Sequence, residues 1–148
     1  MSNIRQTILI RSDLNLPKGL SEAQVAHLHA KKSNDILLHL LEVDLPKVDN
    51  LTPNIISTEF GILKTDLISW LKTPYTFVHG VPNMEVLRHF CKIANDLKVP
   101  YTEWRDTVFL QISKTQQITV ENCCIGIALG PFESDRIKAV IGDLPLLT

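Results

Sequence analysis

The sequence predicts an α/β fold, a three-layer sandwich in which a small mixed four-stranded sheet has helices on both faces. Two observations predict it. Short runs of apolar and β-branched residues alternate along the chain with stretches of helical periodicity. The length of 148 residues and the hydrophobic content of 45% also supply one core without disulfides or a structural metal. We therefore expect a single domain over residues 1–148.

The first predicted strand, residues 4–11, is apolar almost throughout, which is typical of a central strand covered on both faces. After a turn, Ser21 and Gln24 have the spacing of a capping box, so we expect the first helix to begin at Ser21. A polar stretch then interrupts the helical pattern. Residues 36–41 either continue this helix or begin a second one, and Pro46 ends it.

The remaining elements are assigned from the same patterns of apolar periodicity and of proline and glycine breaks. They are a loop at residues 46–60, an amphipathic helix at 63–71, a strand at 75–81, a helix at 84–97, a strand at 101–106, a turn or short strand at 108–112, a polar loop at 113–117, a strand at 123–129, and a last helix after a turn at Gly130 and Pro131.

Charge and hydropathy exclude several classes of protein. The formal net charge of −1 excludes a protein that coats nucleic acid by charge alone, so any such contact must be local. No apolar run approaches the roughly 20 residues that span a bilayer. The N-terminal run is also too short and too poorly flanked for a signal peptide. We expect a soluble, cytoplasmic protein with no membrane partner.

The cysteines and histidines indicate neither a disulfide framework nor a metal site. There are three cysteines, and Cys123 and Cys124 are adjacent, so on a strand they would point to opposite faces. The five histidines lack the spacing of a zinc site. We therefore interpret the cysteines as small hydrophobic residues and expect no metal and no cofactor.

Polar residues follow the first strand, where ligands bind in open α/β sheets. They are Asp13, Lys18, Gly19, Gln24 and His27. If Ser21 caps the helix, Lys18 and Gly19 lie just before its positive end, which favours an anion. Gln24 and His27 are three residues apart and share a helix face. The residues alone also allow ordinary roles, namely a solvated lysine, a glutamine that closes a cap and a half-buried histidine.

A second candidate place is the end of the third predicted strand, at Asp106. A carboxylate there can hold a water molecule or orient a lysine or histidine. It can equally pair with Arg105 or cap a turn. Only convergence with the first place would distinguish a site from ordinary surface chemistry.

The order of these residues resembles the first signature of the type II peptidyl-tRNA hydrolases. That signature runs approximately Asn-Asp-Leu-x-Met-x-Lys-Gly-Lys-x-Ala-Ala-Gln-x-x-His-Ala. The positions in register are Asp13, Leu14, Lys18, Gly19, Ala23, Gln24 and His27. A later family segment, Asp-Ala-Gly-x-Thr-Gln-Ile, is matched at Asp106, Gln111 and Ile112. The predicted elements follow the family order, and we interpret residues 43–73 as an insertion.

The resemblance implies a metal-free hydrolase of the ester that joins a peptide to the 3′ ribose of tRNA. Carried over to this sequence, Lys18 would stabilise the carbonyl oxyanion or contact phosphate, and Asp106 would orient or activate water. His27 and Gln24 would position substrate or water. The resemblance adds Asp13, Gly19 and Gln111 to the substrate-binding residues, peptidyl-tRNA as the partner, and a homodimer.

Departures from the pattern keep an alternative open. Leu20, Val108 and Leu110 stand where the family has polar or small residues. The alternative is a non-catalytic relative of the same fold that binds a nucleotide, RNA or protein partner. A third hypothesis is a cysteine nucleophile at Cys123 or Cys124 served by a histidine, although no motif joins such residues.

Overall fold

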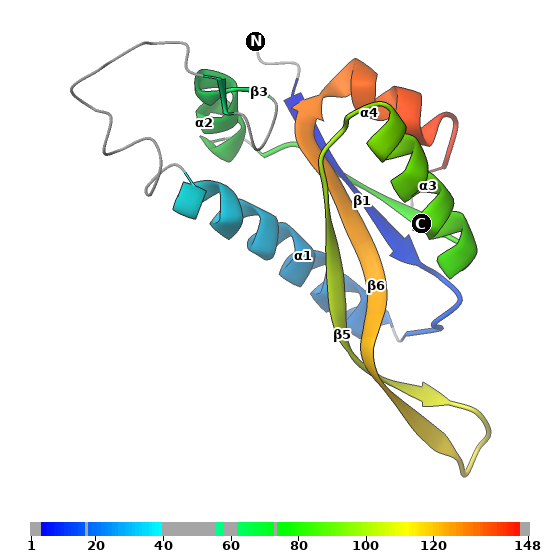
Figure 1. Ribbon diagram of the computed structural model, residues 1–148. Coiled ribbons are helices and arrows are strands. Elements are labelled where there is room, and N and C mark those ends of the chain that lie inside the picture. The colour runs from blue at the N-terminus through cyan, green and yellow to red at the C-terminus, as the bar shows by residue number, and fades with distance from the viewer. Residues whose placement is uncertain (1–3, 17, 40–55, 58–61, 73, 146–148) are drawn as a thin grey trace.

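The structure, a computed structural model, describes residues 4–16, 18–39, 56–57, 62–72 and 74–145 (Figure 1). The strands of its main sheet lie in the order β4 (Thr76–Val81), β1 (Ile4–Arg11), β6 (Gln117–Glu133) and β5 (Tyr101–Gln111). Strand β1 is parallel to β4 and antiparallel to β6, and β6 is antiparallel to β5. The predicted mixed four-stranded sheet is confirmed.

The helices are α1 (Lys18–His39), α2 (Lys64–Lys72), α3 (Met84–Asp96) and α4 (Ser134–Ile141), and two-residue strands β2 (Ile56–Ser57) and β3 (Ile62–Leu63) pair with each other. Helix α1 lies on one face of the main sheet, and α3 and α4 lie on the other (Figure 1). The three-layer arrangement is therefore also as predicted. No helix among the described residues is both long and apolar enough to cross a bilayer.

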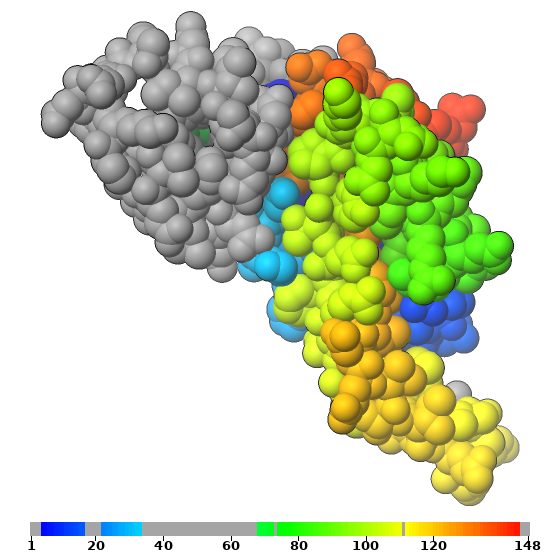
Figure 2. Space-filling view, viewed as in Figure 1, coloured from blue at the N-terminus to red at the C-terminus, as the bar shows by residue number. Residues whose placement is uncertain are grey.

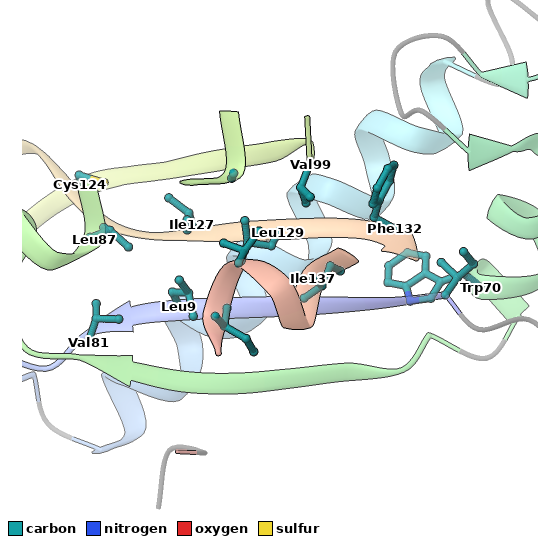
Figure 3. Packing of buried hydrophobic residues seen from close by; sticks show 14 residues of the cluster. Leu9, Trp70, Val81, Leu87, Val99, Cys124, Ile127, Leu129, Phe132 and Ile137 are labelled. Carbon is teal, nitrogen blue, oxygen red and sulfur yellow. The ribbon is translucent and has the colours of Figure 1, made fainter. Parts of the chain in front are cut away.

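Strand β1 supplies both layers of the core because its side chains alternate between the two faces. Ile8 and Ile10 pack with Leu28 of α1, whereas Leu9 packs on the opposite face. The layer beneath α3 and α4 is shown in Figure 3 and includes Leu9, Val81, Leu87, Val99, Ile127, Leu129 and Ile137. The near-continuous apolar run of β1 thus reflects its central position, as the sequence indicated.

Helix α1 differs from the prediction at its start, and in its middle it follows one of the two alternatives that the sequence left open. It begins at Lys18, so the predicted N-cap at Ser21 is wrong and that residue lies in the first turn. A tight turn, in which the Asn15 N–H donates to the Ser12 carbonyl, completes the reversal before Ser21. The helix also continues unbroken through the polar stretch to His39. Lys32 explains this continuity, because it is buried and donates to the Thr102 hydroxyl of β5 at 3.1 Å.

The segment between α1 and β4 is described in part. The predicted helix at residues 63–71 is confirmed as α2, although Leu63 belongs to β3. Trp70 of α2 is buried in the core with β1, and its indole N–H donates to the Tyr75 carbonyl. Pro46 and most of the predicted loop at 46–60 lie outside the described residues. The insertion at 43–73 stays a prediction.

Strands β5 and β6 form a longer hairpin than the sequence indicated. Strand β5 continues beyond Asp106 to Gln111, and β6 begins at Gln117, so only residues 112–116 form the loop. Val108 is buried against the α1 layer, which accounts for the extension of the strand. Figure 2 shows the hairpin tip protruding from the body of the molecule, and Phe109 is 59% exposed there.

The predicted turn at Gly130 and Pro131 is wrong, because β6 runs through both residues to Glu133. The ladder between β1 and β6 shifts register between Arg5 and Thr7. Gly130 and Pro131 of β6 therefore both lie opposite the single residue Gln6 of β1. A proline placed at such an irregularity costs no ladder hydrogen bond. The peptide bond between Gly130 and Pro131 is cis.

Gly126 is required by the close approach of β6 to β1. A Cβ at this position would lie 2.2 Å from the Leu9 carbonyl oxygen, and backbone atoms cannot give way by that much. Only glycine therefore allows the two central strands their observed separation at this point.

Candidate functional site

A buried glutamine joins α1 to β5 in the structure. Gln24 is 3% exposed, and its amide Nε2 donates to Asp106 Oδ2 at 3.2 Å. Its Oε1 accepts from the indole Nε1 of Trp104 at 2.5 Å. An indole N–H can only donate and a carboxylate only accepts, so both ends of the amide are fixed in one orientation. Gln24 and Asp106, which come from the two candidate places in the sequence, are therefore in direct contact.

The carboxylate of Asp106 is held from two sides. While Gln24 binds Oδ2, the backbone N–H of Thr107 donates to Oδ1 at 2.8 Å. Each oxygen keeps a lone pair that can accept from a water molecule or a substrate hydroxyl, since a carboxylate has about four acceptor sites. Asp106 is only partly buried, so such a partner can reach it.

Of the two ordinary roles considered for Asp106, pairing with Arg105 is absent and a local capping bond is present. Arg105 does not pair with it, because the Arg105 guanidinium binds Glu103 at 3.1 Å and the Asn122 carbonyl. The bond from the Thr107 N–H is a local backbone bond of the kind that a turn-capping aspartate makes. That bond occupies one oxygen and leaves the bond to Gln24 unexplained by a cap.

His27 lies one helical turn after Gln24 and beside Trp104. The centroids of the imidazole and indole rings are 5.7 Å apart, with the planes tilted by 57°. His27 is exposed, whereas Trp104 is partly buried against the α1 layer. The site therefore presents an aromatic pair at its surface next to the buried amide.

Lys18 and Gly19 occupy the first turn of α1 rather than the loop before it. Lys18 begins the helix six residues before Gln24, which corresponds to about 9 Å along the axis. The structure does not describe the side chain of Lys18, so its approach to Asp106 stays a prediction. The positive end of the α1 dipole is this same first turn.

Two further predicted residues have other surroundings. Asp13 makes a two-bond ion pair with Arg11 at 2.8 and 3.1 Å, and these bonds raise the pKa of Arg11 above its ordinary value. Arg11 also donates to the Cys124 carbonyl, so Asp13 secures the turn between β1 and α1. Gln111 is at the far end of β5, about 16 Å along the strand from Asp106, and its side chain lies outside the described part.

Trp104 is the site residue that the sequence analysis did not identify. It precedes Asp106 by two residues on one strand, and the period of two places both on the same face. An indole N–H at that spacing from a candidate carboxylate is the signal that could have identified it. Its partner Gln24 is 80 residues away, which a single sequence does not reveal.

Comparison with known proteins decides the family. The model of the family described as peptidyl-tRNA hydrolase PTH2 matches residues 4–147, nearly the whole chain. The chain belongs to the PTH2 family. A peptidyl-tRNA hydrolase of Sulfurisphaera tokodaii is 28% identical over 144 residues, which cover 97% of this chain and 98% of that protein. The resemblance carried by the first motif is thus confirmed, and the chain is peptidyl-tRNA hydrolase-like.

The departures of this PTH2 chain from the family pattern have a packing explanation where they are described. Val108 is 2% exposed, and Leu110 packs against the same apolar layer beneath α1. Both residues lie on the α1 face of β5, which also carries Trp104 and Asp106, and there they take part in apolar packing. Leu20 lies in the first turn of α1, and its side chain is not described. The two described departures therefore give no support to a non-catalytic role.

The cysteines of this PTH2 chain do not form a nucleophilic site in the described part of the structure. Cys123 belongs to the layer under α1 and Cys124 to the layer under α3 and α4, so they point to opposite faces as predicted. Cys124 is buried, and this burial raises the pKa of its thiol. A thiol with a raised pKa yields little of the reactive thiolate. Neither sulfur contacts a histidine there.

Proposed function

We propose that this PTH2 chain hydrolyses the ester between a peptide and the 3′ ribose of tRNA, with Asp106 as the catalytic carboxylate. The observation that carries the proposal is the buried amide of Gln24, which binds Asp106 on one side and Trp104 on the other. A buried amide is costly unless its hydrogen bonds are made, and a fully bonded one is held rigidly in place. Here it fixes the direction of the carboxylate lone pairs.

The reaction follows from this arrangement. A water molecule bound to Asp106 attacks the ester carbonyl carbon while the carboxylate accepts its proton. The new carbon–oxygen bond forms a tetrahedral oxyanion, which the first turn of α1 and the ammonium of Lys18 stabilise. The bond to the ribose 3′ oxygen then breaks, and that oxygen takes the proton back from Asp106. The products are a free peptide and a tRNA with a 3′ hydroxyl.

His27 and Trp104 have the position to bind the substrate beside the reacting ester. Their rings lie 5.7 Å apart at the surface end of the site. An exposed imidazole beside an indole offers a stacking surface for a nucleotide base, whose faces bind aromatic side chains without regard to sequence. The low net charge of the chain agrees with such a local contact better than with a broad cationic face.

The test is the release of peptide from a model peptidyl-tRNA by Asp106→Asn. Loss of the proton acceptor should lower kcat about 100-fold, as is common for general bases. Lys18→Ala should lower kcat at least about tenfold through the oxyanion. Glu85→Gln is the control, because it makes an acid-to-amide change at an exposed position on α3, on the other face of the sheet. Undiminished turnover by both site variants would refute the proposed site.

Membership of the family also motivates proposals about setting and assembly. We propose that the protein acts in the cytoplasm on peptidyl-tRNA, that it forms a homodimer, and that residues 43–73 are an insertion. Light scattering on the purified chain tests the dimer, and a mass of about 16.7 kDa would refute it.

A further inference from the structure

Strand β5 has a free outer edge in the part of the chain that the structure describes, because it pairs there with β6 alone. The Gly130 N–H donates to the Pro100 carbonyl at 2.8 Å, which fixes the phase of the antiparallel ladder. Ladder bonding alternates from residue to residue, so Thr102 and Trp104 bond inward to β6. Tyr101 and Glu103 therefore direct their backbone N–H and C=O groups outward.

A cavity of about 460 Å³ lies at this edge. Lys32 of α1 lines it from one face of the sheet and Asn95 of α3 from the other, with Tyr101 and Glu103 between them. In Figure 2 the residues of β5 form a yellow-green stripe between the cyan of α1 and the green of α3. The cavity is thus placed where a chain alongside β5 would insert side chains.

The edge leads directly to the proposed active site. Glu103 precedes Asp106 by three residues on β5, a distance of about 10 Å. The edge is regular from Tyr101 to Trp104, whereas the register shifts twice between Trp104 and Val108. A peptide that runs from Asp106 toward Tyr101 therefore crosses the first shift, between Trp104 and Arg105, and then meets the regular part of the edge, whereas toward the hairpin tip it meets the second shift directly after Asp106.

We infer that the peptide part of peptidyl-tRNA docks as an added strand on the free edge of β5, with its ester at Asp106 and its N-terminal side toward Tyr101. The inference rests on the proposed function. The peptide would run parallel to β5, since its C-terminal end lies beside Asp106. Strand addition reads the main chain, which suits a substrate whose peptide has no fixed sequence.

The charges of the cavity favour a peptide over the RNA part of the substrate. Lys32 and Glu103 line the same cavity, so it contains one group of each sign. Arg105 also pairs with the Glu103 carboxylate, so these groups supply no surplus positive charge for a phosphate, whereas the peptide backbone is neutral and needs only donors and acceptors. The outward backbone carbonyls of Tyr101 and Glu103 are two residues apart, so they can accept hydrogen bonds from every second N–H of an added peptide strand.

The experiment is a series of model peptidyl-tRNAs with one tRNA and one pentapeptide, each N-methylated at a different residue. Because an added strand donates through every second N–H, kcat/KM should fall about tenfold for alternate positions and stay unchanged for those between them. A uniform or absent response along the peptide would overturn the inference. The Glu103→Pro variant removes one outward N–H and should raise KM for the pentapeptide about tenfold, with the exposed Glu85→Gln of α3 as control.

A short substrate separates the two proposals. N-acetyl-aminoacyl-tRNA carries the ester but no chain long enough to reach Glu103. Its hydrolysis by the wild type, with loss in Asp106→Asn, would support the proposed function whatever the N-methyl series shows. Equal KM values for this substrate in Glu103→Pro and wild type are expected. No hydrolysis of either substrate by the wild type would overturn both proposals.

Discussion

The bond between Gln24 and Asp106 predicts a linked loss of stability and activity. In Gln24→Met the side chain keeps its length but loses its amide. Hydrogen bonds to a charged group contribute about 1.5–3 kcal/mol and neutral ones about 0.5–1.5 kcal/mol. Two such bonds are lost, at 3.2 Å to Asp106 and 2.5 Å from Trp104. Since both partners are partly exposed and water can replace some of each bond, we expect about 2 kcal/mol lower free energy of unfolding.

The effect of Gln24→Met on catalysis should be smaller than that of removing the carboxylate. The Thr107 N–H still holds Asp106 Oδ1, so the carboxylate remains ionisable but less well directed. We expect kcat to fall about tenfold, against about 100-fold for Asp106→Asn.

Urea unfolding followed by circular dichroism and release of peptide from peptidyl-tRNA measure the two effects of Gln24→Met. The control is Gln117→Met, the same change at an exposed position at the start of β6. A free energy of unfolding within about 0.5 kcal/mol of the wild type, with unchanged kcat, would refute the role given to the buried amide.

Two further predictions concern stability. Gly126→Ala should lower the free energy of unfolding by at least about 3 kcal/mol, because the new Cβ would meet the Leu9 carbonyl. Gly142→Ala should lower it by about 1 kcal/mol, because the new Cβ has open space and only the positive φ is unfavourable. Equal urea midpoints for the two variants would contradict this. Burial lowers the pKa of His29, so the fold favours its neutral form. Its contribution to stability is fully present above the unfolded pKa of about 6.5 and is lost as the pH falls from there through the lower folded pKa. The free energy of unfolding should therefore fall less between pH 7 and pH 5 in His29→Gln than in the wild type, and equal slopes would contradict this.

Local patterns predicted most of the fold. The apolar run of β1 and the helical periodicity of α3 are confirmed, and the structure adds a cap to α3, since Asn83 Oδ1 accepts from the Val86 N–H. Where the local pattern left alternatives open or predicted wrongly, tertiary contacts decide the structure. The polar stretch in α1 includes Lys32, whose contact with β5 keeps the helix intact, and Pro131 lies at a register shift that tolerates it.

The candidate site was predicted in part. Order along the chain identified Gln24 and Asp106 through a family resemblance, and the structure joins them directly. Trp104 was missed because its role depends on contact with a helix 80 residues away. Asp13 matches the family motif, but its ion pair with Arg11 depends on a turn geometry that the motif does not state.

The sheet separates two apolar layers, and this separation has a consequence for how the protein can change. The proposed chemistry involves only α1 and β5, whereas the layer under α3 and α4 contains Leu87 and Val140 and lies behind the sheet. Substitutions in that rear layer can therefore adjust melting temperature while the Gln24 amide keeps its partners. Thermal tolerance can therefore be adjusted from the rear layer with little change in turnover.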